Sequence, residues 1–307
     1  MARNSHEGQP QSSPLGRALV LLGDMWTLRI VMLVFAGRRR FQDLRTSLSI
    51  SDPVLSRRLT TLIDGGVLQT RQYQSNPPRN EYLLTDAGLE LWPILVAIWV
   101  WDRRWAGPLH RDAHTTMQHT TCGHAIRPVF GCAACDAIGL GLRDMAGEVE
   151  ESLLLDTRRK RSRRSPSMTT PIDGASVLGD RWSTFLLSDA FTGHRRFNDF
   201  QASLQIAPVT LTQRLQLFLD TGLMTQEEIP GRKRTEYRLT PKALDFFEVT
   251  TAINHWAQTQ LATDGHSGLS LTHIACGAEL VPQYTCNACN NVLDRRAIRF
   301  VGEIVPQ

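Results

Sequence analysis

Apolar residues recur along the first third of the chain at the spacing of one helical face, with polar and glycine-rich breaks between the runs. Ser51 suits an N-cap, Asp52 and Pro53 suit a first helical turn, and the pair at 65–66 is Gly-Gly, which stops a helix. The runs predict a helical region with Leu15, Leu19, Leu22, Trp26, Ile30 and Leu33, a short helix with Phe41, Leu44 and Leu48, and a helix with Leu55, Leu59 and Leu62.

The pattern then changes. Val67 to Tyr73 and Glu81 to Leu84 predict two strands around the loop "SNPPRN". Thr85 is a suitable cap for a long final helix, in which Leu91, Leu95, Ile98, Trp101 and Trp105 keep helical spacing. Helices followed by a hairpin are the order of a winged helix-turn-helix, in which one helix enters a major groove and the hairpin lies beside the DNA backbone.

The whole pattern occurs twice. "LGDMWTLRIVMLVFAGRRRFQDLRTSL" at Leu22 to Leu48 is repeated as "LGDRWSTFLLSDAFTGHRRFNDFQASL" at Leu178 to Leu204, so that Trp26 and Trp182 are 156 positions apart. The repeat continues through "EYLLT" and "EYRLT" to "HTTCG" and "HIACG". The offset falls to 155 and then to 154, which indicates single-residue losses in loops.

We therefore predict a mainly α fold with small β-hairpins, built from two tandem winged helix-turn-helix domains that are each followed by a small zinc-ribbon-like extension. The expected divisions are a disordered N-terminus at 1–13, a winged domain at 14–110, an extension at 111–145, a basic linker at 146–168, a second winged domain at 169–262 and a second extension at 263–307. A chain of 307 residues has room for two such cores.

Charge and hydropathy indicate where the protein is located and what kind of partner it binds. No apolar run reaches the roughly 20 residues that a membrane span needs, and Met1 to Ser13 lacks the apolar core of a signal peptide, so a cytoplasmic location without membrane contact is expected. The net charge is only +4, but "RRKRSRR" at 158–164 is strongly basic. It suits a polyanionic partner, and equally a solvated linker.

The third helix and the hairpin suggest how double-stranded DNA would be bound. Arginine pairs well with guanine and glutamine with adenine, whereas wing cations contact phosphates, although an ordinary solvated helix face has a similar pattern. The candidate DNA-binding residues are Ser51, Val54, Arg57, Arg58, Thr61 and Arg79 in the first copy and Thr210, Gln213, Arg214, Arg232, Lys233 and Arg234 in the second.

The segments "LGDMWTLRIV", "RRRFQDLRTSLSIS" and "LSRRLTTLIDGGVLQTRQYQSNPPRNEYLLTDAGLEL" resemble the HxlR-type winged helix-turn-helix transcriptional regulators, over most of Pro14 to Trp105. Pro171 to roughly Gln258 resembles them more loosely, and its wing lacks "PPR". The resemblance implies a recognition helix, a wing, a dimer-forming final helix and transcriptional regulation, with repression as our interpretation. The cysteine through which some members sense oxidants or aldehydes is replaced by Ser13 and Thr170.

A Cys/His cluster ends each copy and uses all six cysteines. Three cysteines per copy suit a disulfide framework poorly, and a histidine at the same short spacing completes four ligands for a tetrahedral ion. Zinc is the expected ion, two per chain, with iron as an alternative. The predicted ligand sets are His119, Cys122, Cys132 and Cys135 in the first copy and His273, Cys276, Cys286 and Cys289 in the second. His124 has no counterpart at Ala278 and is expected on the surface.

Other roles for the clusters remain open at this point. Four protein ligands close a zinc site to substrate, which favours a structural role over catalysis. The alternatives are free or redox-active thiols, a Cys/His oxidoreductase, a redox sensor that releases zinc, or an interaction module. No glycine-rich phosphate loop, Ser-His-Asp pattern or dinucleotide motif supports an enzyme. The sequence does not identify an operator or a small-molecule effector.

The two copies also suggest an internal dimer. If the final helices, Asp86 to Trp105 and Pro241 to Gln260, pack with Trp101 and Trp256 at equivalent positions, one chain would supply both halves of a DNA-binding pair. The alternative is a homodimer that reads DNA with two first copies.

Overall fold

The computed structural model describes residues 13–106, 116–149, 173–178, 181–228, 235–261 and 269–301. The basic segment 158–164 and the wing residues Arg232, Lys233 and Arg234 lie outside this described part of the chain. Within it the expected class is confirmed, because helices predominate and the strands form small antiparallel sheets.

The first copy contains the predicted elements with two differences. Its elements are α1 (Pro14–Leu22), α2 (Met25–Phe35), α3 (Phe41–Leu48), α4 (Asp52–Asp64), β1 (Leu68–Ser75), β2 (Pro78–Leu84), α5 (Asp86–Leu89) and α6 (Trp92–Trp105). The first helical region is broken because the Asp24 side chain caps α2, accepting from the backbone N–H of Trp26 at 3.0 Å. The long final helix is divided into α5 and α6, with Pro93 in the first turn of α6.

The predicted caps are also resolved. The Thr85 hydroxyl accepts from the backbone N–H of Gly88 at 3.0 Å and so caps α5 as expected. Ser51 stands at the N-cap of α4, but its side chain makes no capping hydrogen bond. Helix α4 ends at Asp64, followed by Gly65 and Gly66.

The second copy repeats this order. Its elements are α7 (Gly174–Leu178), α8 (Arg181–Phe191), α9 (Phe197–Leu204), α10 (Pro208–Asp220), β7 (Met224–Glu228), β8 (Thr235–Leu239), α11 (Pro241–Asp245) and α12 (Phe247–Gln260). Leu211, Leu215 and Phe218 form the buried stripe of α10, as Leu55, Leu59 and Leu62 do in α4.

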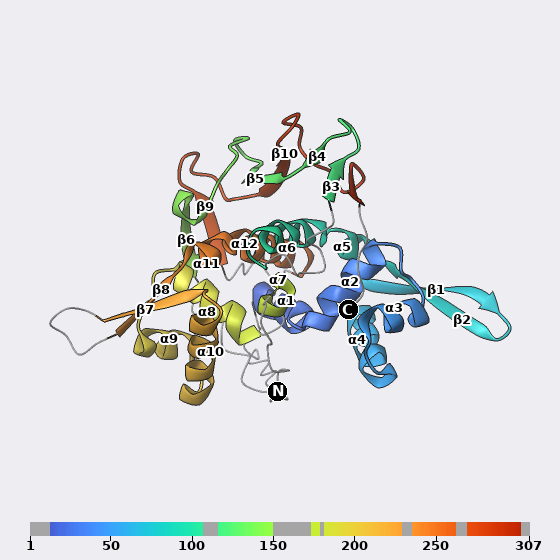
Figure 1. Ribbon diagram of the computed structural model, residues 1–307, viewed down its shortest axis with the longest axis horizontal. Coiled ribbons are helices and arrows are strands. Elements are labelled where there is room, and N and C mark those ends of the chain that lie inside the picture. Colours follow the sequence, from blue (N-terminus) through green and yellow to red (C-terminus); the bar gives the residue numbers. More distant parts are fainter. Residues whose placement is uncertain are drawn as a thin grey trace, which may run out of the picture.

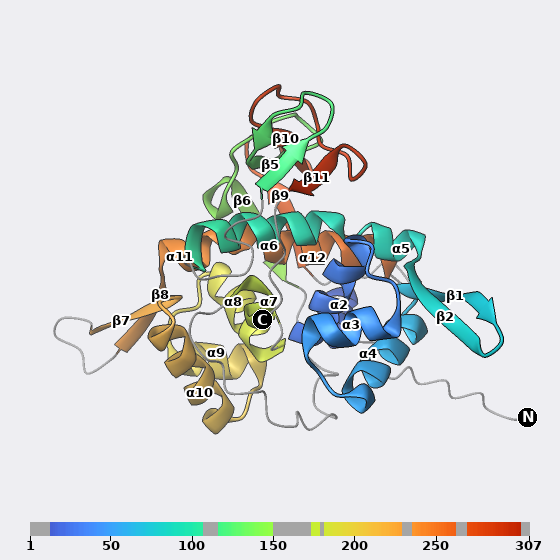
Figure 2. The same ribbon diagram turned by 45° about the vertical axis from the view of Figure 1, so that its right-hand side comes forward.

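Helices α6 and α12 pack together at the centre of the molecule, which is the arrangement that the internal-dimer alternative requires (Figures 1 and 2). Trp101 donates its indole N–H to the carbonyl of Lys242 at 2.9 Å, and Trp256 donates to the carbonyl of Ala87 at 2.9 Å. Because Lys242 and Ala87 are themselves equivalent positions, each copy makes the same hydrogen bond to the other. The two copies are therefore related by a pseudo-twofold axis within one chain.

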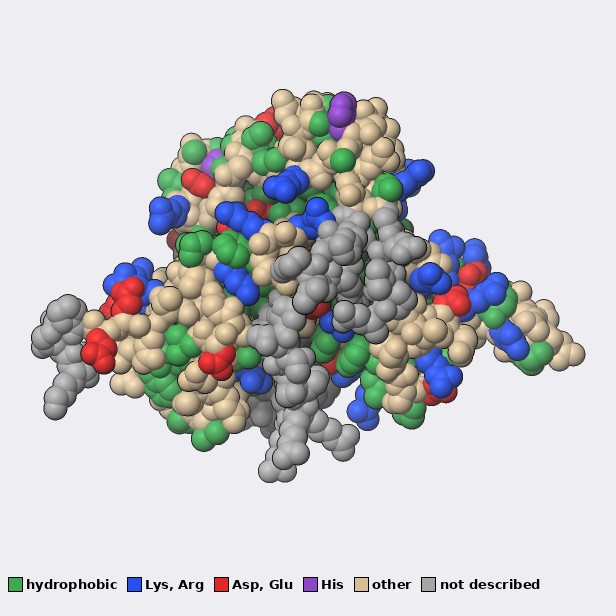
Figure 3. Space-filling model, viewed as in Figure 1, with side chains coloured by type: hydrophobic (Ala, Val, Ile, Leu, Met, Phe, Trp, Pro, Cys, Tyr) green, Lys and Arg blue, Asp and Glu red, His purple; other side chains and the backbone are tan. Residues whose placement is uncertain are grey.

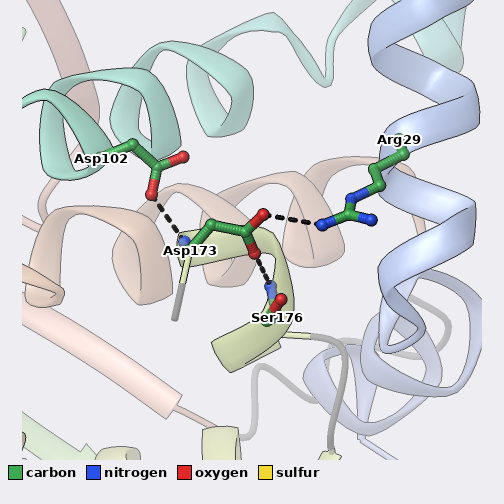
Figure 4. A network of polar contacts seen from close by, with 5 residues as sticks. Arg29, Asp102, Asp173 and Ser176 are labelled. Atoms are coloured by element: carbon green, nitrogen blue, oxygen red, sulfur yellow. Dashed lines mark hydrogen bonds and ion pairs between the residues drawn. The ribbon is translucent and has the colours of Figure 1, made fainter. Parts of the chain in front are cut away.

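A polar network also joins the copies (Figure 4). Asp173 accepts from Arg29 of α2 at 2.8 Å and from the backbone N–H of Ser176 at 2.7 Å. Asp102 of α6 is 4% exposed and accepts from the backbone N–H of Gly174 at 2.7 Å. The start of α7 is thus held by two helices of the first copy.

The two C-terminal extensions are intertwined and do not form separate ribbons. Their elements are β3 (Thr116–His119), β4 (Ala125–Ile126), β5 (Pro128–Cys132), η2 (Leu142–Asp144), β6 (Met145–Val149), β9 (Leu269–His273), β10 (Pro282–Cys286) and β11 (Ile298–Val301). Strand β5 pairs with β10, β3 with β11, and β6 with β9, all antiparallel and all between copies. Phe130 and Tyr284 are register partners at the centre, with ring centroids 5.7 Å apart. These strands lie above α6 and α12 (Figure 2).

In the described parts of the chain no single helix is long and apolar enough to cross a membrane. Helices α1 and α2 would be long and apolar enough only if they were counted as one helix, but the chain bends by 80° between them.

Candidate functional site

The extensions bring all eight predicted metal ligands into two groups, but the grouping differs from the one predicted. One group is His119, Cys122, Cys286 and Cys289, and the other is Cys132, Cys135, His273 and Cys276. Each group therefore takes two ligands from each copy. The sequence-based assignment of four consecutive ligands to one ion is wrong, because strand exchange between the extensions separates the two ligand pairs of each copy.

The ligand atoms in each group converge. They lie within 4.8 Å of one another. In the first group the Cys122 sulfur is 3.3 Å from His119 Nδ1 and 3.8 Å from the Cys286 sulfur, and the Cys289 sulfur is 3.4 Å from His119 Nδ1. In the second, His273 Nδ1 is 3.3 Å from the Cys135 sulfur and 3.2 Å from the Cys276 sulfur.

These separations can be compared with those of a tetrahedral ion. With metal–sulfur bonds of about 2.3 Å and metal–nitrogen bonds of about 2.0 Å, tetrahedral angles place two sulfurs about 3.8 Å apart and a sulfur and a nitrogen about 3.5 Å apart. The observed distances of 3.8 Å between sulfurs and 3.2–3.4 Å between sulfur and nitrogen are close to both values. The two groups can therefore hold metal ions without a rearrangement of the backbone.

The local backbone explains how each short ligand pair is formed. In every pair the residue directly after the second cysteine has a positive φ: Gly123 at 72°, Asp136 at 57°, Gly277 at 69° and Asn290 at 59°. Glycine, asparagine and aspartate tolerate this conformation best. The N–H groups of Gly123, Gly277 and Asn290 each donate, at 2.8 Å, to the carbonyl of the first ligand in their pair. Four tight turns thus aim two side chains each at one point.

The cysteine environments favour thiolates at some positions. A hydrogen bond from the backbone N–H of Ala278 lowers the pKa of Cys276 to about 7, and His273 acts in the same direction. At Cys135 the backbone N–H of Ala137 lowers the pKa, but partial loss of hydration and the neighbouring thiols of Cys276 and Cys132 outweigh it and raise the pKa. Crowded thiols of this kind are stabilised as thiolates when a cation binds between them.

Burial separates the two histidines of these groups from His124. His119 and His273 are 1% and 2% exposed, whereas Cys135 and Cys276 lie at the surface. His124 is exposed and belongs to neither group, as its absence from the second copy predicted.

The candidate DNA-binding residues of α4 differ in their surroundings. Ser51, Val54 and Arg57 are exposed, and Thr61 is half-buried with its hydroxyl donating to the Arg57 carbonyl at 3.0 Å. Arg58 is also half-buried, and its guanidinium contacts the carboxylate of Asp24 at 2.6 Å. Arg58 therefore anchors α4 to the start of α2, and only the other positions face outward.

Helix α10 of the second copy shows a similar division. Gln213 is exposed, Thr210 is half-buried, and Arg214, at the position equivalent to Arg58, is half-buried as well. Val209, at the first turn of α10, is 69% exposed. The outward positions of α10 thus carry no arginine, in contrast to Arg57 of α4.

The first wing is basic, and the second is partly acidic. Arg79 lies on β2 and is exposed, with Gln74 as its register partner. At the positions of Arg71 and Gln72 in the first wing, the second wing has the exposed residues Glu227 and Glu228. Figure 3 shows Lys and Arg side chains gathered at the right-hand end of the molecule, which holds the first wing.

The structure adds candidate residues that were not predicted. Arg38, Arg39 and Arg40 follow α2 and are exposed beside the first wing, where the Arg40 guanidinium lies over the Tyr73 ring at 4.7 Å from its centroid. The carbonyl of Arg39 accepts from the N–H of Tyr82 at 2.8 Å, which fixes this segment to β2. The run "RRR" was the available signal, but only the fold places it next to the wing.

Helices followed by a hairpin, in the same order in both copies, define a tandem winged helix-turn-helix protein. Residues 21–110 and 177–264 match the family described as HxlR-like helix-turn-helix, and the chain belongs to this family. It is 37% identical over 131 residues to an uncharacterized HTH-type transcriptional regulator of Mycobacterium tuberculosis, covering 43% of this chain and 81% of that protein.

The chain is also similar to two further proteins. The uncharacterized HTH-type transcriptional regulator YvaP of Bacillus subtilis is 36% identical over 97 residues, which is 31% of this chain and 90% of YvaP. The solved structure of PA1374 from Pseudomonas aeruginosa is 34% identical and covers 35% of this chain and 74% of PA1374, with a TM-score of 0.29. These relatives are named as transcriptional regulators and not as enzymes.

Proposed function

We propose that this protein is a sequence-specific regulator of transcription in which a single chain supplies both DNA-reading domains of a dimer. The observation that carries the proposal is the reciprocal pair of hydrogen bonds from Trp101 to Lys242 and from Trp256 to Ala87. They relate the two winged domains by a pseudo-twofold axis, which is the symmetry with which paired recognition helices meet two half-sites.

The placement of the recognition helices supports this reading. In both ribbon views α4 and α10 lie on the side of the molecule opposite the extensions, and the wings point outward at the two ends (Figures 1 and 2). A duplex along this side would meet both helices. The expected half-sites are about 34–36 Å apart, one helical turn of DNA.

The two halves would read different bases. Arg57 can bind guanine through two hydrogen bonds, whereas Gln213 at the equivalent position suits adenine. Val54 and Thr210 offer methyl groups to thymine. The proposed operator is therefore an imperfect palindrome with one half richer in guanine contacts.

The two halves would also differ in charge. Arg38, Arg39 and Arg79 place cations around the first wing, whereas the second wing carries the exposed Glu228 and also Glu227, which is ion-paired with Arg238 at 2.6 Å. The second wing also contains Arg232, Lys233 and Arg234, so both wings would contact phosphates but with different charge patterns. The basic segment 158–164 would add salt-sensitive affinity with little specificity.

Zinc is the ion that best fits the two Cys/His groups, because it favours closed tetrahedral sites of sulfur and nitrogen. With three sulfurs and one nitrogen in each group, no position is left for substrate. We therefore assign the ions a structural role, in which each would join the two copies. The exposure of Cys135 and Cys276 favours a second function as a redox sensor, because oxidation of these thiols would release the ion.

The experiment that tests the proposal is footprinting on a genomic binding site, combined with the mass of the protein–DNA complex. One chain on an asymmetric site supports the single-chain dimer. Two chains on a perfect palindrome, with second copies away from the DNA, would contradict it. Transcription in vitro from the same site, with and without protein, tests the expected repression.

A further inference from the structure

The two halves of the molecule differ where the extension strands meet the central helices. Beside the first copy, Trp99 of α6 packs edge-on against Phe300 of β11, with ring centroids 6.1 Å apart. The position equivalent to Trp99 in α12 is Asn254, because both this pair and the equivalent pair Trp101 and Trp256 are 155 positions apart. Phe300 pairs with Met117 of β3, and the residue equivalent to Met117 in the second copy is Leu271 of β9. Leu271 pairs with Gly147 of β6, so Gly147 stands where Phe300 stands in the other half.

Two more large side chains are replaced by small ones in the same place. Met32 of α2 corresponds to Ser188 of α8, and Leu95 of α6 corresponds to Thr250 of α12. These exchanges leave a cavity of about 240 Å³ between α8, α12, β6 and β9, lined by Gly147, Ser188 and Thr250 among others. The cavity thus occupies the place of the aromatic pair and its neighbours.

The lining has a definite chemical character. Phe191, Phe247 and Leu271 contribute apolar walls, and none of the described residues that line the cavity has an ionisable side chain. Thr250 donates its hydroxyl to the carbonyl of Phe247 at 2.9 Å and is satisfied. Thr251 also lines the cavity, is 2% exposed, and its hydroxyl has no hydrogen-bond partner.

Asn254 adds a second unpaired group next to this place. Its amide N–H donates to the carbonyl of Leu269 at 2.9 Å, whereas its Oδ1 atom is buried without a partner. Buried polar groups in folded proteins are nearly always hydrogen-bonded. The unpaired Thr251 hydroxyl in the cavity lining, with the unpaired Asn254 Oδ1 atom three residues further along α12, therefore favours a binding partner at this place.

We propose that this cavity binds a small, neutral and mostly apolar molecule that carries a hydroxyl or similar hydrogen-bonding group, such as an aromatic alcohol. An apolar cavity of about 150 Å³ accommodates benzene, so the available volume has room for a substituted aromatic ring. Neutrality follows from the uncharged lining, since a charged ligand would lose its hydration without gaining a partner. The ligand would contact both the second winged domain and the extensions.

The test uses the full-length, metal-loaded protein and 2-naphthol as the probe, with naphthalene as the matched apolar probe. Calorimetry and ligand-observed NMR should show one molecule of 2-naphthol bound per chain with a Kd below about 1 mM. No binding of either probe to the wild type would overturn the proposal.

Refilling the cavity provides the decisive variant. Gly147→Phe combined with Asn254→Trp restores the aromatic pair of the other half, and a Cβ at Gly147 has room because its nearest neighbour is Leu271 Cδ2 at 3.4 Å. Affinity for 2-naphthol should fall at least about tenfold. Unchanged affinity in this variant, with its metal content retained, would show binding elsewhere and overturn the proposal.

A smaller change keeps the test valid if the refilled variant does not fold. Thr251→Val preserves shape and removes the unpaired hydroxyl. It should weaken 2-naphthol binding by about fivefold to tenfold and leave naphthalene binding unchanged. Equal effects on both probes, or none on 2-naphthol, would contradict the proposed hydrogen bond and with it the assigned ligand class.

Discussion

The sulfur of Cys122 lies 3.8 Å from the sulfur of Cys286, although 164 residues separate them in the chain. An ion bound here would join the first extension to the second. An ion in the other group would also join them, with its histidine supplied by the second copy and not by the first. Because two such links close a long stretch of chain, metal binding would stabilise the relation between the copies as well as the local turns. The distance between the recognition helices would then depend on both ions.

The crossed arrangement predicts which double variants lose one ion and which lose two. Cys122→Ser with Cys286→Ser removes ligands from a single group and should leave about one zinc ion per chain. Cys122→Ser with Cys132→Ser affects both groups and should leave almost none. The measurement is metal analysis of the purified protein by mass spectrometry.

The control for this experiment is His124→Ala, which should retain both ions because His124 belongs to neither group. If ligands were grouped within each copy, the two double variants would give the reverse result. That outcome would refute the crossed sites.

Arg57 and Arg58 should respond differently to substitution, although they are neighbours in the sequence. Arg58→Ala removes a half-buried ion pair with Asp24 at 2.6 Å and should lower the free energy of unfolding by about 1 kcal/mol. Arg57→Ala should leave stability unchanged and reduce discrimination between DNA sequences by about 1–3 kcal/mol. Denaturant unfolding and competition binding measure the two effects. Equal loss of stability in both variants would be inconsistent with this division.

The reciprocal tryptophans predict a cost for losing the link between copies. Trp101→Phe leaves the carbonyl of Lys242 without its donor and reduces packing against Phe246, whose ring centroid is 5.3 Å away. We expect a loss of about 1–3 kcal/mol in the free energy of unfolding. Tyr73→Phe, at an exposed wing position, is the matched control and should have no effect. Urea titrations of both variants check this, and identical midpoints would count against the role of Trp101.

Glu248 predicts a pH dependence of stability. Burial, followed by the negative charge of Asp245, raises the pKa of Glu248 to about 7, against about 4.3 in an unfolded chain. Between these values the folded state keeps the proton and the unfolded state loses it, so the contribution is present at low pH and is lost as pH rises to about 7.

Glu248→Gln tests this directly, because glutamine resembles the protonated acid. The variant should be more stable than the wild type by about 2–3 kcal/mol at pH 8, and the difference should be small at pH 5. Thermal or urea unfolding at the two pH values gives the comparison. A difference that does not change with pH would show that Glu248 titrates normally.

Much of the local structure followed from the sequence. The spacing of Leu55, Leu59 and Leu62 predicted α4, Thr85 predicted a helix start, and the repeat predicted two equivalent winged domains. These features depend on residues that are close in the chain, where periodicity and capping act directly. The break between α1 and α2 was missed, because the capping role of Asp24 competes with a continuous apolar pattern.

The eight candidate metal ligands were likewise identified from the sequence, since Cys and His at these short spacings are the residue types that ligate zinc from a tight turn. The tertiary structure decided which of these residues share one group. A ligand pair such as His119 and Cys122 fixes only half of a site, and either half of the chain can complete it with the same chemistry. The pairing of β5 with β10 across the pseudo-twofold axis brings Cys286 and Cys289 to the first pair, and no local pattern encodes that choice. In the same way, the sequence shows that residue 58 is a cation, but its burial against Asp24 was decided by the packing of α4 on α2.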